Sequence, residues 1–190
     1  LSTNSAINIT GTYAELRNTN NTTSISGSTI NLLSDNQIFN IPGGHNLNFS
    51  NTSYIRLLAA NGLLNFNGSV NINNANATNY IQLGPTSAVV KQINVNNSFA
   101  FPIGTASNFL PVTVNSLTGG GNPNFTIGVF EGASTNAQPA GPAAYKPPIV
   151  DAIWNIRQNG NNTKDVTLSF GWQNALEGNV FSGLANNQLG

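Results

Sequence analysis

Few side chains of this chain can take part in acid–base or nucleophilic chemistry. Its 190 residues include six acids, six Lys or Arg residues, one His and no Cys. The two acids closest in sequence are Asp165 and Glu177, which are too far apart to share one short motif. Glycoside hydrolysis needs two opposed carboxylates, and no spacing here indicates such a pair, although distant acids can converge in a fold. His45 lies in the turn Pro42–Asn46, far from any acid, so we expect an exposed or turn-bonded imidazole and not a catalytic one.

Metal and phosphate sites have no strong signal either. The lack of Cys excludes thiolate ligands, and no Asp-x-Asp-x-Asp run of the calcium-binding kind is present. Asn side chains and loop carbonyls leave a weak calcium site open. The glycine run Thr118–Asn122 is not followed by the Lys-Ser/Thr of a phosphate-binding loop, so we expect a flexible hairpin loop there. The sequence thus predicts no enzyme activity, no cofactor and no resident metal.

Amides and hydroxyls supply the polar groups instead of charges. We count 35 Asn residues in the sequence, whereas charged residues make up 6% and the net charge is zero. A nucleic-acid partner needs a basic stripe that replaces counterions, and an anionic membrane surface needs a similar cluster; the scattered bases form neither. A chain without net charge has little electrostatic protection against self-association. No apolar run approaches the length of a membrane span, and the start at Leu1 suggests a segment whose targeting signal has been removed.

Period-two alternation predicts an all-β fold, because apolar residues recur at every second position and helical periodicity is nearly absent. Residues 1–95 carry many short strands roughly 8 to 10 residues apart, separated by Gly-containing turns. This pattern fits a β-solenoid with stacked amides or an antiparallel sandwich, and the sequence does not decide between them. Residues 96–190 have longer loops, notably 117–124 and 133–148, and are expected to form an antiparallel β-sandwich. Within it, residues 153–156 and 166–172 are expected to pair as a hairpin.

A family resemblance rests on four stretches of the second half. They read FPIGT at Phe101–Thr105, LPVTV at Leu110–Val114, AIWNI at Ala152–Ile156 and VTLSFGW at Val166–Trp172. Their order resembles a module of large secreted surface proteins of Bacteroidota, in which a β-helix-like segment rich in Asn, Gly and Thr precedes such a sandwich. The resemblance covers roughly residues 80 to 175. It implies export by the type IX secretion system and a place at the cell surface or outside the cell, and it carries over no catalytic residues.

One departure from that family concerns the end of the module. Family modules usually continue beyond the position of Trp172 with further strands, and this chain stops at Gly190. The remainder has been removed, or the chain is a fragment, or a neighbouring subunit supplies the missing strand. The last alternative predicts assembly by strand addition, because an incomplete sandwich exposes unpaired backbone groups.

The leading hypothesis is therefore an extracellular structural or adhesive protein, a subunit of a filament or array that assembles by strand addition. The segment Leu1–Thr10 is the first candidate for subunit contact, because Ile7 and Ile9 alternate as in an inserted strand; the alternative is the first strand of its own sheet. The second hypothesis is a carbohydrate- or surface-binding module, with a surface glycan as partner. Trp154 and Trp172 are expected in the core, which leaves Tyr145 as the best exposed aromatic residue.

Overall fold

The first half of the chain winds into a β-solenoid with three walls of parallel strands. The structure is a computed structural model, and it describes residues 4–17, 20–118, 121–146, 149–160 and 165–182. The first wall contains five strands: β1 (Ala6–Ile9), β4 (Thr29–Leu32), β7 (Ser53–Leu57), β10 (Asn79–Leu83) and β13 (Ile103–Gly104). The second wall begins with β2 (Tyr13–Glu15), β5 (Ile38–Ile41), β8 (Leu63–Phe66) and β11 (Ala88–Gln92). The third wall consists of β3 (Thr22–Ser26), β6 (Asn46–Ser50) and β9 (Asn71–Asn73).

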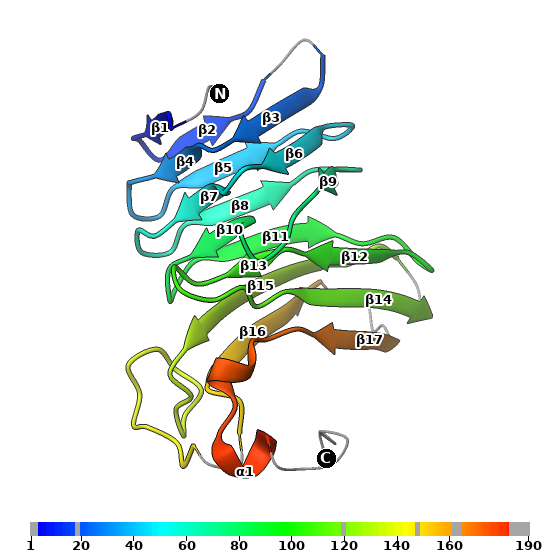
Figure 1. Ribbon diagram of the computed structural model, residues 1–190. Helices are drawn as coiled ribbons and strands as arrows, with labels where there is room; N and C mark the ends of the chain where they lie inside the picture. Colours follow the sequence, from blue (N-terminus) through cyan, green and yellow to red (C-terminus); the bar gives the residue numbers. More distant parts are fainter. Residues whose placement is uncertain (1–3, 18–19, 119–120, 147–148, 161–164, 183–190) are drawn as a thin grey trace.

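Each turn of the chain around the solenoid is here called a coil (Figure 1). The first three coils contribute one strand to each wall, and the fourth contributes β10 and β11 to the first two walls. Corresponding residues of successive coils lie side by side, so Ile38, Leu63 and Ala88 pair in register at a constant sequence spacing. Every pair of neighbouring strands among the twelve strands named above is parallel. The solenoid expectation for the first half is therefore confirmed, and the antiparallel alternative for residues 1–95 is wrong.

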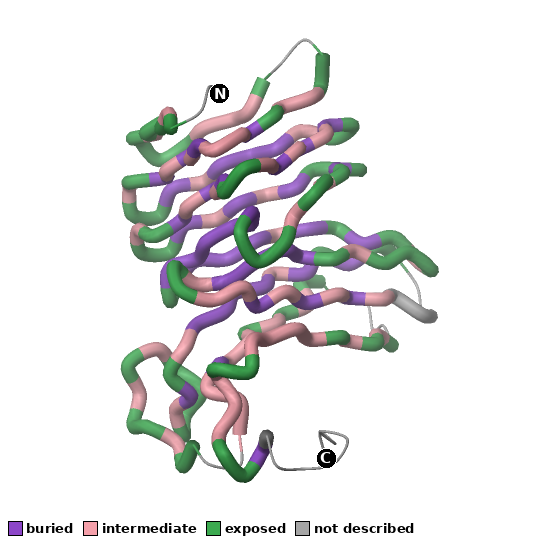
Figure 2. The backbone as a smooth tube through the Cα atoms, in the orientation of Figure 1, coloured by how far each residue is buried: buried purple, intermediate pink, exposed green. Residues whose placement is uncertain are grey.

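Aliphatic columns along the solenoid axis hold the coils together. In the first wall, Ile7, Ile30, Ile55, Ile81 and Ile103 stack in register. Period-two alternation points these side chains inward, and Figure 2 shows the buried residues running along the inside of the stack. Leu47 and Phe49 of the third wall are fully buried in the same core. Because burial of each such side chain contributes about 1.5–3 kcal/mol, the repeated aliphatic columns supply most of the driving force for coiling.

Amide ladders run along the outside of the same coils. The Asn65 side-chain amide donates to Asn40 Oδ1 at 2.9 Å, and Asn73 donates to Asn48 Oδ1 at 2.7 Å. Asn36 and Asn61 occupy one corner with φ of 57° and 56°, and Asn61 donates to Asn36 Oδ1 at 3.2 Å. Asn tolerates this left-handed conformation better than most residues. The abundant Asn therefore serves both as a turn residue and as a ladder residue, the two alternatives that the composition left open.

The second half closes one end of the solenoid with antiparallel strands. β15 (Asn124–Glu131) and β16 (Ala152–Asn159) extend the second wall beyond β11, which gives the sheet order β16-β15-β11-β8-β5-β2. A separate sheet contains β12 (Ser98–Phe101), β14 (Val112–Thr118) and β17 (Asp165–Phe170). The short helices η1 (Asn174–Leu176) and α1 (Asn179–Ser182) follow. The second wall thus crosses position 95, while the division into domains 1–95 and 96–190 stays a prediction.

Two expected hairpins of the second half are wrong. β16 pairs with β15 and β17 pairs with β14, so the segment between β16 and β17 joins two sheets. The glycine run likewise connects β14 to β15, which belong to different sheets. Local alternation identified these strands, but it does not specify which partner each strand takes.

Tryptophan side chains lie where the antiparallel end of the second wall meets the sheet of β12, β14 and β17. The Trp154 ring lies 5.1 Å from that of Phe170 and 6.3 Å from that of Trp172, and both Trp side chains pack against the core. Trp154 Nε1 donates to Leu110 O at 3.1 Å, and Trp172 Nε1 donates to Glu177 Oε1 at 2.9 Å. Each indole therefore has a hydrogen-bond partner for its polar edge. Within the described part of the chain, no helix has the length and apolar character needed to cross a membrane.

Candidate functional site

The first coil exposes the segment that the sequence singled out for contact. β1 pairs in parallel with β4, so residues 6–9 form the first strand of their own wall. The Ile7 side chain is 43% exposed, whereas Ile9 packs against the core. Residues 1–3 lie outside the described part of the chain, and a role of Ile7 and Ile9 in subunit contact stays a prediction.

The backbone of the first coil also presents hydrogen-bonding groups to the outside. On either side of β2, Thr12 O accepts from Ile38 N and Leu16 N donates to Asn40 O, both at 2.9 Å. Because alternate residues of a strand bond to the same side, the N–H and C=O groups of Tyr13 and Glu15 point away from β5. The described residues provide no second neighbouring strand for β2. This unpaired edge is a template for a further strand.

The strand β16 lies at the opposite edge of the same sheet. β16 forms the opposite end of the second wall, and among the described residues it pairs only with β15. One column of residues crosses the whole sheet: Glu15, Asn40, Asn65, Val90, Thr126 and Arg157. A carboxylate therefore begins this column at the β2 edge, and a guanidinium ends it at the β16 edge. Glu15 Oε2 accepts from Arg17 at 3.0 Å in an exposed ion pair.

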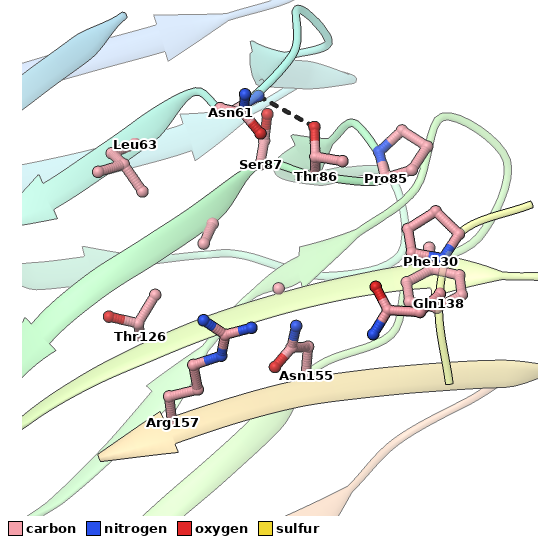
Figure 3. A pocket seen from close by; sticks show the side chains of 13 residues that line it. Asn61, Leu63, Pro85, Thr86, Ser87, Thr126, Phe130, Gln138, Asn155 and Arg157 are labelled. Atoms are coloured by element: carbon pink, nitrogen blue, oxygen red, sulfur yellow. Dashed lines mark hydrogen bonds between the residues drawn. The ribbon is translucent and has the colours of Figure 1, made fainter. Parts of the chain in front are cut away.

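A groove of about 340 Å³ lies on the outer face of the second wall (Figure 3). Its floor contains small residues, including Ala88 and Gly128. A Cβ at Gly128 would lie 2.9 Å from Ser87 O, so a larger residue there would force the neighbouring strand to shift. Asn155 and Arg157 from β16 line one side, and Phe130 and residues of the 133–148 connection line another. The lining of the groove combines apolar side chains with hydroxyl, amide and guanidinium groups.

His45 is buried, so the expectation of an exposed or turn-bonded imidazole is wrong. Its side chain is fully inaccessible, and His45 Nε2 lies 3.0 Å from Thr23 Oγ1 of the preceding coil. No hydrogen-bond partner is found for Nδ1 within the described residues. Burial lowers the pKa of His45, because desolvation disfavours the imidazolium. His45 therefore occupies an interior corner of the solenoid as a neutral ring.

Among the described residues, Tyr145 is the most exposed of the large hydrophobic side chains, at 77%. It lies in the connection between β15 and β16, close in sequence to Lys146, whose Nζ lies 2.5 Å from Asp151 Oδ2. Asp151 Oδ1 also accepts from Ala133 N at 2.7 Å. Burial acts to raise the pKa of Asp151, but the hydrogen bonds from Lys146 and Ala133 outweigh it and lower that pKa. A binding role for Tyr145 stays a prediction.

Within the described residues, no group of three His, Cys, Asp or Glu side chains could hold a metal ion.

The sequence analysis did not identify two functional candidates, Arg157 and the buried Lys91. Lys91 lies in a column whose preceding members, Ile41 and Phe66, recur at a constant spacing, so its inward position could be read once that period is known. Arg157 joins its column through the antiparallel strands β15 and β16, and no constant spacing marks it.

Comparisons with protein-family models, with curated proteins and with solved structures found no match to this chain.

Proposed function

We propose that the protein is an extracellular structural or adhesive subunit that assembles head to tail through the two unpaired edges of its second wall. The observation that supports this proposal best is the column that runs from Glu15 to Arg157. In a head-to-tail stack, the β2 edge of one copy meets the β16 edge of the next, and the two opposite charges face each other.

The contacts needed for such a stack already occur between coils of the molecule. Adjacent strands of the second wall exchange backbone hydrogen bonds, and the Asn40–Asn65 pair adds an amide bridge. A second copy would extend this arrangement by one more strand pair of the same sheet. Edge-to-edge addition of this kind obtains its affinity from main-chain hydrogen bonds. The zero net charge adds little repulsion between copies.

The symmetry of the contact favours a filament. The two edges are different surfaces of the molecule, so their association is heterologous, and it generates an open filament when the rotation between copies does not close a ring. We assign the antiparallel sheets to a β-sandwich module at one end of the solenoid, in keeping with the resemblance to secreted surface proteins of Bacteroidota. A cell-surface or extracellular location follows from the same resemblance.

A charge exchange tests the proposed contact. Glu15→Lys and Arg157→Glu each place like charges across the interface, so each variant should associate several-fold more weakly than the wild type in sedimentation velocity at low salt. The double variant restores opposite charges and should recover association. Asn159→Lys, on the same strand as Arg157 but outside the column, is the matched control for an added charge. Equal association of the wild type, the two single charge variants and the double variant would contradict the proposal.

The groove on the second wall favours a second candidate function, the binding of a carbohydrate. Its mixed lining, which includes the Phe130 ring and the amide of Asn155, suits a sugar ring with hydroxyl groups. On a glycan array, Asn155→Ala should weaken binding about tenfold, while Asn159→Ala, which lies outside the groove, should not. Loss of binding in Tyr145→Ala alone would assign the site to the exposed aromatic residue instead. Absence of glycan binding by the wild type would exclude this candidate.

A further inference from the structure

One interior position of the solenoid holds a lysine where its neighbours are apolar. Ile41, Phe66, Lys91 and Phe125 pair in register across the second wall. The three apolar members are at most 2% exposed, and Lys91 is 7% exposed. Burying an ammonium group costs free energy unless the charge is compensated. Lys91 is therefore an exception to the pattern that forms the core.

The Lys91 ammonium reaches a break in the third wall. β9 and β12 belong to separate sheets, so the parallel ladder of this wall stops between them. Nζ donates to Gly68 O and, at 2.8 Å, to Gln92 O. It also lies 5.4 Å from the centre of the Phe99 ring. An ammonium has three N–H donors, and the two carbonyls are its hydrogen-bond acceptors in the described residues.

A groove of about 660 Å³ opens at this break, and Lys91 is part of its lining. Ligand pockets typically have volumes of about 300–1,000 Å³. Residues 68–71 line one side, and residues 96–99 line another. The lining contains four Asn residues (Asn71, Asn94, Asn96 and Asn97) and no acid.

The charge balance of the groove points to an anion. No carboxylate of the described residues lies within 4.0 Å of the Lys91 ammonium. Desolvation lowers the pKa of Lys91, and a bound anion would oppose this effect. The Asn amides offer both donors and acceptors, as the hydroxyl groups of a sugar require.

We propose that the groove between β9 and β12 binds an acidic saccharide, with the Lys91 ammonium as the counter-ion of the sugar carboxylate and the neighbouring Asn amides bound to its hydroxyls. This site lies outside the edge column and outside the groove of Figure 3. The proposal therefore stands independently of head-to-tail assembly.

D-galacturonate and D-galactose form a matched pair of probes, because only the first carries a carboxylate. We expect galacturonate to cause saturable NMR shifts at the backbone amides of Gln92 and Ser98, and galactose to bind at least about tenfold more weakly, since a hydrogen bond to a charged group contributes about 1.5–3 kcal/mol. Equal affinity for the two sugars, or no saturable shift with galacturonate, would overturn the proposal. Tighter binding of a tri-aspartate peptide than of galacturonate would also overturn it.

Two independent substitutions test whether galacturonate binds in this groove. Lys91→Met keeps a long apolar side chain and should reduce galacturonate affinity at least about tenfold. Asn71→Asp places a competing carboxylate in the groove and should have a similar effect. Asn73→Asp is the matched control: Asn71 and Asn73 each donate to the preceding coil, to Asn46 Oδ1 at 2.9 Å and Asn48 Oδ1 at 2.7 Å, but only Asn71 lines the groove. Equal losses in the two Asn variants would contradict the proposed site, as would unchanged affinity in a folded Lys91→Met protein.

Discussion

The first coil and the antiparallel end are the two terminal regions of one core, and they differ in how that core is covered. At the first coil, Ile7 continues the column of Ile30 and Ile55, yet it is 43% exposed while they are 2% and 0% exposed. At the other end, β15 and β16 continue the second wall, and the sheet of β12, β14 and β17 covers the core from a second side. In the described part of the chain, the first coil therefore leaves its outer layer partly exposed, whereas the change to antiparallel strands covers the core at the other end.

The largest expected difference between the two regions is in the aliphatic column. Ile55→Ala creates a cavity between coils and should lower the free energy of unfolding by about 4 kcal/mol, whereas Ile7→Ala should cost about 1 kcal/mol or less in a dilute sample. Urea unfolding followed by circular dichroism measures both. Similar losses at the two positions would show that the first coil is covered in solution.

Aromatic residues give the next comparison. Trp154→Ala removes ring contacts with Phe170 and Trp172 and the hydrogen bond to Leu110 O, and should cost about 3 kcal/mol. Tyr13→Ala, at a side chain that is 61% exposed in the first coil, should change stability by less than about 0.5 kcal/mol. Thermal unfolding of the two variants provides the measurement. The account of the antiparallel end fails if Trp154→Ala unfolds at the wild-type temperature.

The stability that each amide-ladder bond contributes should decrease toward the first coil, and this difference should be smaller than the two above. Asn65→Ala removes the bond to the buried Asn40 side chain and should cost about 1 kcal/mol. Asn31→Ala removes the exposed bond to Asn8 Oδ1, at 2.8 Å, and should cost about half as much. The comparison requires chemical unfolding of both single variants in the same buffer. If Asn31→Ala lowers the free energy of unfolding as much as Asn65→Ala or more, the expected decrease toward the first coil is contradicted.

The smallest expected effect is a pH dependence that arises from Asp151 at the antiparallel end. The folded pKa of Asp151 is lower than its unfolded pKa, so its contribution to stability is present above the unfolded pKa, about 4, and disappears as pH falls through the folded pKa. Asp151→Asn should therefore reduce stability at neutral pH and flatten the stability curve in the acid range. Lys146→Met should reduce the dependence of stability on pH in part. If this dependence is unchanged in both variants, the Lys146–Asp151 ion pair does not cause it.

The strands were predictable from local sequence, but their partners were not. Alternation in residues such as Leu47–Phe49 predicts a strand with one buried face, whichever neighbour it has. The parallel stack depends on a constant sequence period, which is present in the Asn pairs 40/65, 46/71 and 48/73 but is masked by the general abundance of Asn. The pairing of β17 with β14 has no local signal, because the intervening residues 119–164 include two strands of another sheet.

The candidate sites were harder to predict for the same physical reason. Glu15 and Arg157 lie near opposite ends of the sequence and share one column only through five successive strand pairs. Lys91 follows Val89 and Val90, and its inward direction depends on the register of β11 with β8. His45 was misjudged because a turn residue is usually exposed, whereas this corner is covered by the coils beside it. The sequence shows the type of each of these residues, but it does not show which residues become their neighbours in the fold.

Hydrogen–deuterium exchange at the backbone amides of Tyr13 and Glu15 tests the central proposal most directly. Both amides point away from β5, whereas the amide of Ala14, between them, faces β5 and serves as an internal control. If the second-wall edges join head to tail, exchange at Tyr13 and Glu15 will slow strongly as protein concentration rises, while Ala14 stays protected throughout. Rapid exchange at Tyr13 and Glu15 at every concentration, with Ala14 protected, would contradict strand addition at this edge.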